Sequence, residues 1–134
     1  MSNFHCEIVT PSHLFFEGDA NFVVLPGKEG EIGVYAQHEP YVVTLKEGCV
    51  RVKQDDNSTE QLKFAVAGGF AQISSNKVII LAKRAVAYDD IDRDKALKKK
   101  EELASKLDAL EPNDNNAAFI RSEIEWNTLL CNMK

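Results

Sequence analysis

The hydrophobic pattern of the chain changes near residue 88, and this change restricts the fold more than any other feature. Before it, short segments alternate apolar and polar side chains, as where Val50 and Val52 flank Arg51. A period of two predicts half-buried strands. After residue 92, leucines recur at steps of three and four, which predicts an amphipathic helix. We therefore divide the 134 residues into a β-rich domain, 1–87, and a helical domain, 88–134.

The β-rich domain contains many short strands. Residues 22–26, 41–46 and 77–83 are rich in valine and isoleucine with little alternation, which is typical of central strands. Short strands with frequent turns predict a sandwich or a barrel, and the lack of helix-length insertions argues against parallel βαβ units. We place Gly68 and Gly69 at a bend or a close backbone approach. Turns are predicted at residues 11–12, 17–19, 26–27, 46–48, 55–58 and 75–76.

The helical domain is predicted to be an antiparallel hairpin. Asp90 or Asp92 caps the first helix, which stops before Pro112 because the residue preceding a proline avoids helical geometry. A polar link of about six residues suits a tight connection between antiparallel helices. Helices of this length are marginal alone, so the hairpin must pack on the β-rich domain or on a partner. The predicted apolar stripes are Leu97, Leu103, Ala104, Leu107 and Leu110, then Phe119, Ile120, Ile124, Trp126, Leu129, Leu130 and Met133.

Composition excludes several classes of protein. A net charge of −5 argues against nucleic-acid binding, which usually needs a basic excess. Cys6, Cys49 and Cys131 are scattered, without a CxxC spacing, so we expect reduced thiols and no metal site. The chain lacks an apolar run of about twenty residues, and its first residues resemble neither a signal nor a transit peptide. We expect a protein of the cytosol, or of a compartment with its own ribosomes.

The stretch GEIGVYAQHEP, residues 30–40, contains the residues that most suggest chemistry: Glu31, His38 and Glu39. No phosphate-binding loop, nucleophile elbow or HExxH pattern accompanies them. Adjacent residues on an extended segment point in opposite directions, so His38 and Glu39 make a poor acid–base pair. We favour a loop that contacts a partner. A small hydrolase using Glu31 and His38 is the enzyme alternative, and it predicts turnover that is lost in His38→Ala.

Two longer motifs carry a resemblance to a known family. GEIGVYAQHEPYV resembles the GELGIxPGHxPL loop, and FAVAGGFAQISSNKVIILAKRAV resembles the VSGGF segment, of the epsilon subunit of F-type ATP synthases. The resemblance implies a ten-stranded antiparallel β-sandwich followed by an antiparallel helix pair. It implies a non-catalytic rotor subunit, without cofactor, that binds the gamma subunit and the c-ring and helps to couple proton translocation to ATP synthesis. In bacteria, this subunit lies at the cytoplasmic face of the inner membrane.

The resemblance also assigns roles to residues. It implies a contact loop for the c-ring and gamma, and a helix pair that extends along gamma to the alpha and beta subunits and blocks ATP hydrolysis. It places a regulatory ATP motif on the first helix. Lys95 stands where the family has arginine, and lysine lacks the planar fork that grips phosphate, so ATP binding should be weak. A stand-alone binding module with a helical arm is the alternative, and it would bind no gamma subunit. The implied residues are Gly30, Glu31, Gly33, His38 and Pro40 for the loop, and Ile91, Asp92, Lys95, Ala96 and Arg121 for ATP.

Other departures from the family pattern are few. Ala36 and Gln37 replace Pro-Gly, Ala67 replaces serine and Gln72 replaces glutamate. These departures, and the scarcity of arginine in the second helix, leave the predicted fold intact but argue against strong inhibition.

Overall fold

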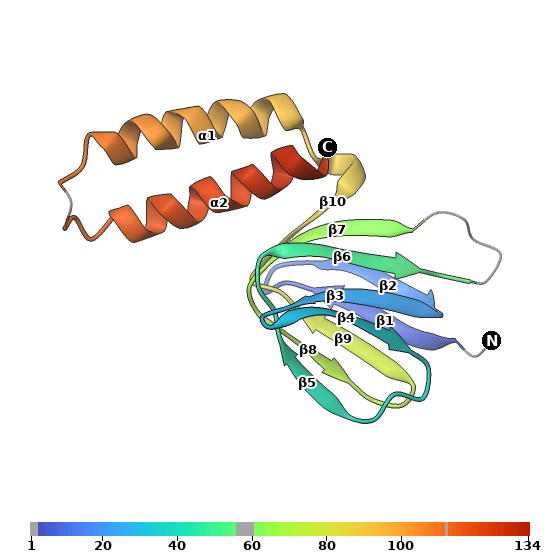
Figure 1. Cartoon of the computed structure of the whole chain (residues 1–134). Helices are drawn as coiled ribbons and strands as arrows, with labels where there is room; N and C mark the ends of the chain where they lie inside the picture. Colours follow the sequence, from blue (N-terminus) through green and yellow to red (C-terminus); the bar gives the residue numbers. More distant parts are fainter. Residues whose placement is uncertain (1–2, 56–60, 112) are drawn as a thin grey trace. The chain divides into compact units, whose positions relative to one another are not determined.

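The computed structural model describes residues 3–55, 61–111 and 113–134. Most of the turn predicted at 55–58, and Pro112 itself, lie outside these residues. The chain forms two compact units, Met1–Tyr88 and Asp89–Lys134 (Figure 1). Each is described by itself below.

The first unit is a sandwich of two five-stranded sheets, which confirms the predicted sandwich and excludes the barrel. Sheet A has the order β2-β1-β9-β8-β5, and sheet B has the order β10-β7-β6-β3-β4. Neighbouring strands run antiparallel, except that β1 pairs with β9 in parallel. The strands are β1 (Phe4–Val9), β2 (Leu14–Ala20), β3 (Phe22–Gly27), β4 (Gly30–Tyr35), β5 (Tyr41–Thr44), β6 (Gly48–Lys53), β7 (Leu62–Ala67), β8 (Phe70–Ile73), β9 (Lys77–Leu81) and β10 (Arg84–Ala87).

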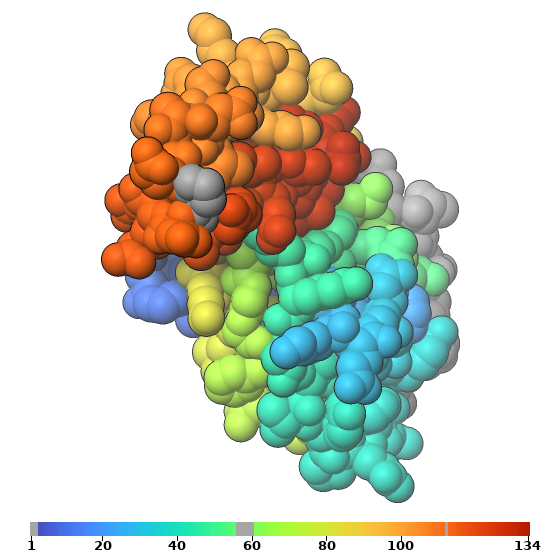
Figure 2. Space-filling model, turned by 60° about the vertical axis from the view of Figure 1, so that its left-hand side comes forward, coloured from blue at the N-terminus to red at the C-terminus, as the bar shows by residue number. Residues whose placement is uncertain are grey.

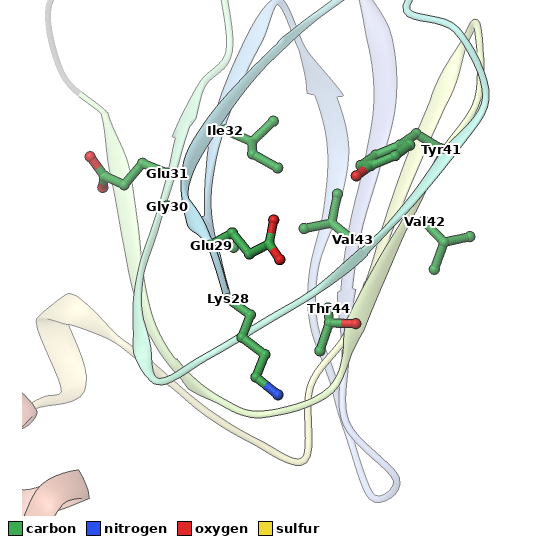
Figure 3. Close-up of a pocket in the computed structure, with 10 residues that line it drawn as sticks. Lys28, Glu29, Gly30, Glu31, Ile32, Tyr41, Val42, Val43 and Thr44 are labelled. Atoms are coloured by element: carbon green, nitrogen blue, oxygen red, sulfur yellow. The ribbon is translucent and has the colours of Figure 1, made fainter.

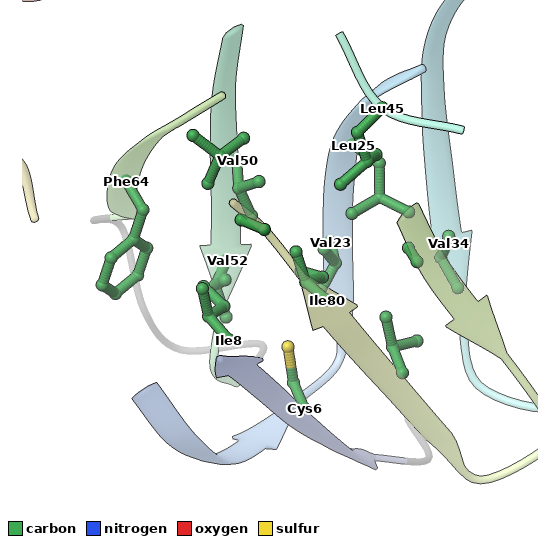
Figure 4. Packing of buried hydrophobic residues seen from close by; sticks show 14 of the residues in the cluster. Cys6, Ile8, Val23, Leu25, Val34, Leu45, Val50, Val52, Phe64 and Ile80 are labelled. Carbon is green, nitrogen blue, oxygen red and sulfur yellow. The ribbon is translucent and has the colours of Figure 1, made fainter. Parts of the chain in front are cut away.

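The core lies between the two sheets and follows the predicted alternation. Val50 and Val52 are fully buried, while Arg51 between them lies on the outer face of sheet B. Ile8, Leu25 and Ile80 are also fully buried in the same cluster (Figure 4). Burying one such side chain contributes about 1.5–3 kcal/mol, so the inward positions supply most of the stability of this unit.

The structure corrects the prediction for residues 30–40. Gly30–Tyr35 is not loop but the edge strand β4, paired antiparallel with β3. Val34 is buried and Ile32 packs against the core, whereas Glu31 and Tyr35 are exposed. This alternation is visible in the letters EIGVY, but the glycines and charged residues around it led to the prediction of a loop. Only residues 36–40 connect β4 to β5.

The second unit is a helix pair, α1 (Arg93–Asp108) and α2 (Ala117–Met133), preceded by the short 3-10 helix η1 (Tyr88–Asp90). Asp92 caps α1, because its side-chain oxygen accepts a hydrogen bond from the Lys95 amide at 3.1 Å. The Cys131 thiol near the end of α2 lies 4.0 Å from the Arg93 carbonyl at the start of α1. The helices are therefore antiparallel (Figure 1), as predicted.

The buried side of each helix differs from the predicted stripe. In α1, Ala96 and Leu103 are buried, whereas Leu97 is 38% exposed. In α2, Trp126 is buried but Phe119 is 64% exposed. The buried stripe of α1 thus starts one residue earlier than predicted. The spacing of the leucines allows several rotations of the helix about its own axis, and packing against a second helix selects one of them. Among the described residues, neither helix has both the length and the apolar character needed to cross a bilayer.

Candidate functional site

A cleft of about 350 Å³ separates the β3–β4 turn from strand β5 (Figure 3). β4 and β5 are edge strands of different sheets, so the sandwich is open between them. Two backbone hydrogen bonds hold the turn beside β5: the Lys28 amide donates to the Thr44 carbonyl at 2.8 Å, and the Lys46 amide donates to the Pro26 carbonyl at 3.0 Å. The cleft is lined by Gly27, Lys28, Glu29, Gly30, Glu31, Ile32, Tyr41, Val42, Val43 and Thr44.

Glu31 lies at the rim of this cleft, on the outer side of β4. Its side chain is 61% exposed and points away from Tyr41 (Figure 3). Its carboxylate pairs with the Arg51 guanidinium on β6, at 3.2 and 3.3 Å. An exposed ion pair of this kind contributes at most about 1 kcal/mol. Glu31 can therefore exchange Arg51 for a group on a partner at little cost.

His38 lies beyond the other end of β4, in the loop 36–40. Its Nδ1 lies 2.7 Å from the Glu39 carbonyl, and the preceding Gln37 amide donates to the Ser75 carbonyl at 2.7 Å. Four residue steps, from Glu31 to Tyr35, span about 13 Å at the usual rise of a strand. Glu31 therefore lies in β4 and His38 in the loop beyond its other end, an arrangement that does not favour the hydrolase alternative. The predicted contact residues therefore fall into two regions: β4 contains Gly30, Glu31 and Gly33, and the loop 36–40 contains His38 and Pro40.

Gln37 occupies the left-handed region of backbone space, with φ of +63°. This is the position where the resembled family carries glycine, and glycine adopts such a φ without the strain of a Cβ atom. We expect Gln37→Gly to stabilise the chain by about 0.5–1 kcal/mol, measured by urea unfolding. The matched control is Gln72→Gly in β8, which should destabilise by about the same amount because a strand disfavours glycine. A loss of stability in Gln37→Gly would contradict the prediction.

The outer face of sheet A carries an exposed strip of apolar side chains. The register aligns Phe70, Leu81, Val9 and Leu14 across strands β8, β9, β1 and β2. Phe70 is 41% exposed and Leu14 is 55% exposed. An exposed apolar patch of this kind marks an interaction surface. We call Val9, Leu14, Val42, Phe70, Ile79 and Leu81 the apolar strip.

The sequence analysis missed the apolar strip, although a signal was present. Residues 78–82 are apolar at successive positions, and the segment 77–83 was interpreted as a central strand. β9 is central in sheet A, but only Val78 and Ile80 are buried in the core, while Ile79 and Leu81 face outward and are partly exposed. A strand that is apolar on both faces indicates that a second surface covers it. The loop 36–40 adjoins this surface, since Pro40 and Val42 line one shallow hollow with Ile79.

The proposed ATP motif is explained largely by local structure. Ile91 and Ala96 are buried, and Asp92 serves as the helix cap. Lys95 is exposed and lines a shallow hollow on α1 together with a second lysine, Lys98, and three carboxylates, Asp92, Asp94 and Glu101, so negative charge is in slight excess there.

Arg121 does not lie near Lys95. It precedes Cys131 by ten residues, or about 15 Å along α2, whereas Cys131 is the residue that contacts the start of α1. The helix pair therefore does not gather these two cations around one phosphate group.

Burial makes the Cys6 thiol unsuitable as a nucleophile or a metal ligand. Burial raises the pKa of the Cys6 thiol to about 12, with a smaller contribution from the Glu7 carboxylate. Burial also raises the pKa of the partly buried Cys49 thiol. Because the thiolate is the metal ligand and nucleophile, Cys6 acts as a small core residue.

Comparison with known proteins places the chain beside one group of rotary enzymes. The family described as "ATP synthase, Delta/Epsilon chain, beta-sandwich domain" matches residues 3–88. The chain is 36% identical over 124 residues to the ATP synthase epsilon chain of Polaromonas naphthalenivorans, covering 92% of this chain and 88% of the relative. It is 37% identical over 107 residues to that of Brevibacillus brevis, covering 80% of each.

Two solved structures share the fold. One is a chain of the Euglena gracilis mitochondrial ATP synthase (OSCP/F1/c-ring), with a TM-score of 0.80 at 23% identity, covering 97% of this chain and 80% of that one. The other comes from the central stalk/c-ring of the Tetrahymena thermophila mitochondrial ATP synthase, with a TM-score of 0.59 at 14% identity, covering 97% of each chain. The space-filling view shows the segment from the β3–β4 turn to β5, in blue to turquoise, at the molecular surface (Figure 2).

Proposed function

The chain belongs to the ATP synthase epsilon chain family, and from this premise we propose that it is a non-catalytic central-stalk subunit that couples proton translocation to ATP synthesis. The Tetrahymena chain with this fold comes from a structure described as central stalk and c-ring. The observation that carries the proposal is the apolar strip on sheet A, which suits a permanent protein partner. The subunit would be peripheral, at the cytoplasmic face of a bacterial inner membrane, and would need no cofactor.

The gamma subunit is the partner proposed for the apolar strip. Phe70, at 41% exposure, provides an aromatic anchor on β8, beside the central strand β9, and aromatic anchors of this kind dominate the free energy of binding. The loop with His38 and Pro40 extends this surface at one border, because Pro40 and Val42 line the same hollow. A more polar rim around an apolar centre is the usual anatomy of a protein interface.

The c-ring is the partner proposed for the opposite end of β4. Lys28, Glu29 and Glu31 place charges of both signs around the cleft beside β5. A polar loop of a ring subunit can enter this cleft, while Glu31 exchanges its weak pairing with Arg51 for a group on the ring. The stretch 30–40 would then serve two partners, one at each end of the strand.

The helix pair is proposed to be an inhibitory arm that extends along gamma toward the alpha and beta subunits. It forms a compact unit of its own, Asp89–Lys134, so it can move without unfolding the sandwich. Its buried residues include small alanines, Ala96 and Ala117, which contribute little apolar area. The consecutive lysines 98–100 offer positive charge for an acidic surface on another subunit. Since Lys95 and Arg121 lie apart, we propose that this arm acts without bound ATP.

Reconstitution tests the function. The catalytic head, stripped of its own copy of this subunit, is mixed with the full chain or with a chain ending at Tyr88, the last residue of the first unit. We expect both to bind gamma, and only the full chain to lower ATP hydrolysis, because the arm is missing from the shorter one. Binding is measured by co-sedimentation and hydrolysis by phosphate release.

The other outcomes distinguish the alternatives. If both chains bind gamma and neither changes the rate, the inhibitory arm is wrong while the stalk assignment stands. If neither chain binds gamma, the stand-alone binding module is the better interpretation. A Glu31→Lys full chain should still bind gamma but should restore less proton-coupled ATP synthesis in membranes that contain the c-ring.

A further inference from the structure

A histidine and two glutamates gather on the outer face of sheet A, at the border of the apolar strip. The register sets Glu7 on β1 opposite Glu17 on β2, and His5 follows on the same face. The His5 Nε2 atom lies 3.4 Å from Glu7 Oε1 and 3.9 Å from Glu17 Oε1. One ligand atom from each residue lies within 4.8 Å of both others. Neither the proposed contact with gamma nor that with the ring uses these three side chains.

We propose that His5, Glu7 and Glu17 form a surface site for zinc or a similar divalent transition metal. Four ligands at about 2.0 Å in a tetrahedron stand about 3.3 Å from one another, close to the two distances observed here. The His5–Glu7 distance already fits, and the Glu17 side chain, which is 51% exposed, can move closer to bind the same ion, with water completing the coordination. An imidazole nitrogen beside two carboxylates favours zinc over magnesium or calcium, which prefer oxygen ligands alone.

Lys77 is a further charged neighbour of Glu7. Its Nζ atom lies 3.8 Å from Oε2 of Glu7, the oxygen that does not face His5. The two oxygens of Glu7 therefore have different neighbours, with the lysine on one and the imidazole on the other. The ammonium group of Lys77 competes with a bound cation for Glu7, but an exposed ion pair of this kind contributes at most about 1 kcal/mol, so a divalent metal can displace it. Asp19, opposite His5 in the register, adds further negative charge.

The site can be altered without damage to the core. His5 and Glu7 alternate along β1 with Phe4, Cys6 and Ile8, which point inward and are buried. Substituting the outward residues therefore leaves the packing between the sheets unchanged. The inference does not depend on the stalk function, since the site is complete within one chain.

The test is titration of the full chain with zinc chloride, followed by NMR of the histidine rings. The chain has three histidines, His5, His13 and His38, so their ring nitrogens can be assigned separately. We expect saturable shifts at His5 alone, and no response to magnesium. His5→Gln and Glu17→Gln should each weaken zinc binding at least about tenfold.

Two matched variants serve as controls. His13→Gln removes an exposed histidine from the neighbouring turn, and Glu39→Gln removes an exposed carboxylate, so neither should change the affinity for zinc. Zinc binding that is unchanged in His5→Gln would overturn the proposal. So would shifts that begin at His13 or His38, or zinc held by Cys131, which would move no histidine ring. The absence of saturable binding would leave a simple ion-pair cluster, again against the proposal.

Discussion

Gly69→Ala is expected to destabilise the sandwich by at least about 3 kcal/mol. Gly69 links β7 to β8 with φ of +93°, a conformation that side chains rarely adopt. An added Cβ would overlap the backbone carbonyl of Leu81 and lie 2.9 Å from the Ala82 Cα. The Leu45 amide donates to the Gly69 carbonyl at 3.0 Å, so this segment cannot move aside without losing a hydrogen bond.

Gly68→Ala is the matched control for this substitution. Gly68 also has a positive φ, +67°, but an added Cβ would meet only the side chain of Lys83, with Cδ at 3.1 Å. A flexible side chain can move, so we expect a loss of about 1 kcal/mol from backbone strain alone. Urea unfolding should be followed by NMR signals of the strands, because the single tryptophan, Trp126, reports on the helix pair. Equal losses in both variants would contradict the predicted clash.

Phe70→Ala is expected to weaken gamma binding about 100-fold, the effect of removing an aromatic hot spot from an interface. Phe70 lies in the apolar strip between Thr44 and Leu81, and its ring faces away from the core. The substitution should change the free energy of unfolding little, since the ring is 41% exposed in the isolated chain. Affinity for purified gamma can be measured by calorimetry or surface plasmon resonance.

Tyr35→Ala provides the control on the opposite sheet. Tyr35 is 54% exposed on sheet B and stacks on Phe22, with ring centroids 4.5 Å apart. It offers a similar aromatic surface, so its loss should leave gamma affinity within about threefold if sheet A is the docking face. A larger effect from Tyr35→Ala than from Phe70→Ala would place the interface on sheet B.

Local patterns in the sequence were sufficient for much of the fold. Alternation predicted the strands around Val50 and Val52, leucine spacing predicted the first helix, and a mixed apolar pattern predicted the second. The sequence offered Asp90 or Asp92 as the cap of the first helix, and the structure selects Asp92. The edge strand β4 was missed although its alternation was visible, since glycines at Gly30 and Gly33 resemble a loop when the neighbouring strand is unknown.

The sequence by itself determined the types and order of most elements, β4 excepted, because these depend on the properties of neighbouring residues. Only the tertiary structure decided the register, and with it the surfaces. Pairing β4 with β3 set Glu31 near one end of this strand and His38 in the loop beyond the other end. The sequence analysis had assigned both residues to one loop. Pairing β1 with β2 and β9 brought His5 to Glu17 and aligned Val9 with Leu81. These contacts join residues that are distant along the chain, and burial of a shared core selects among the pairings that local preferences allow equally.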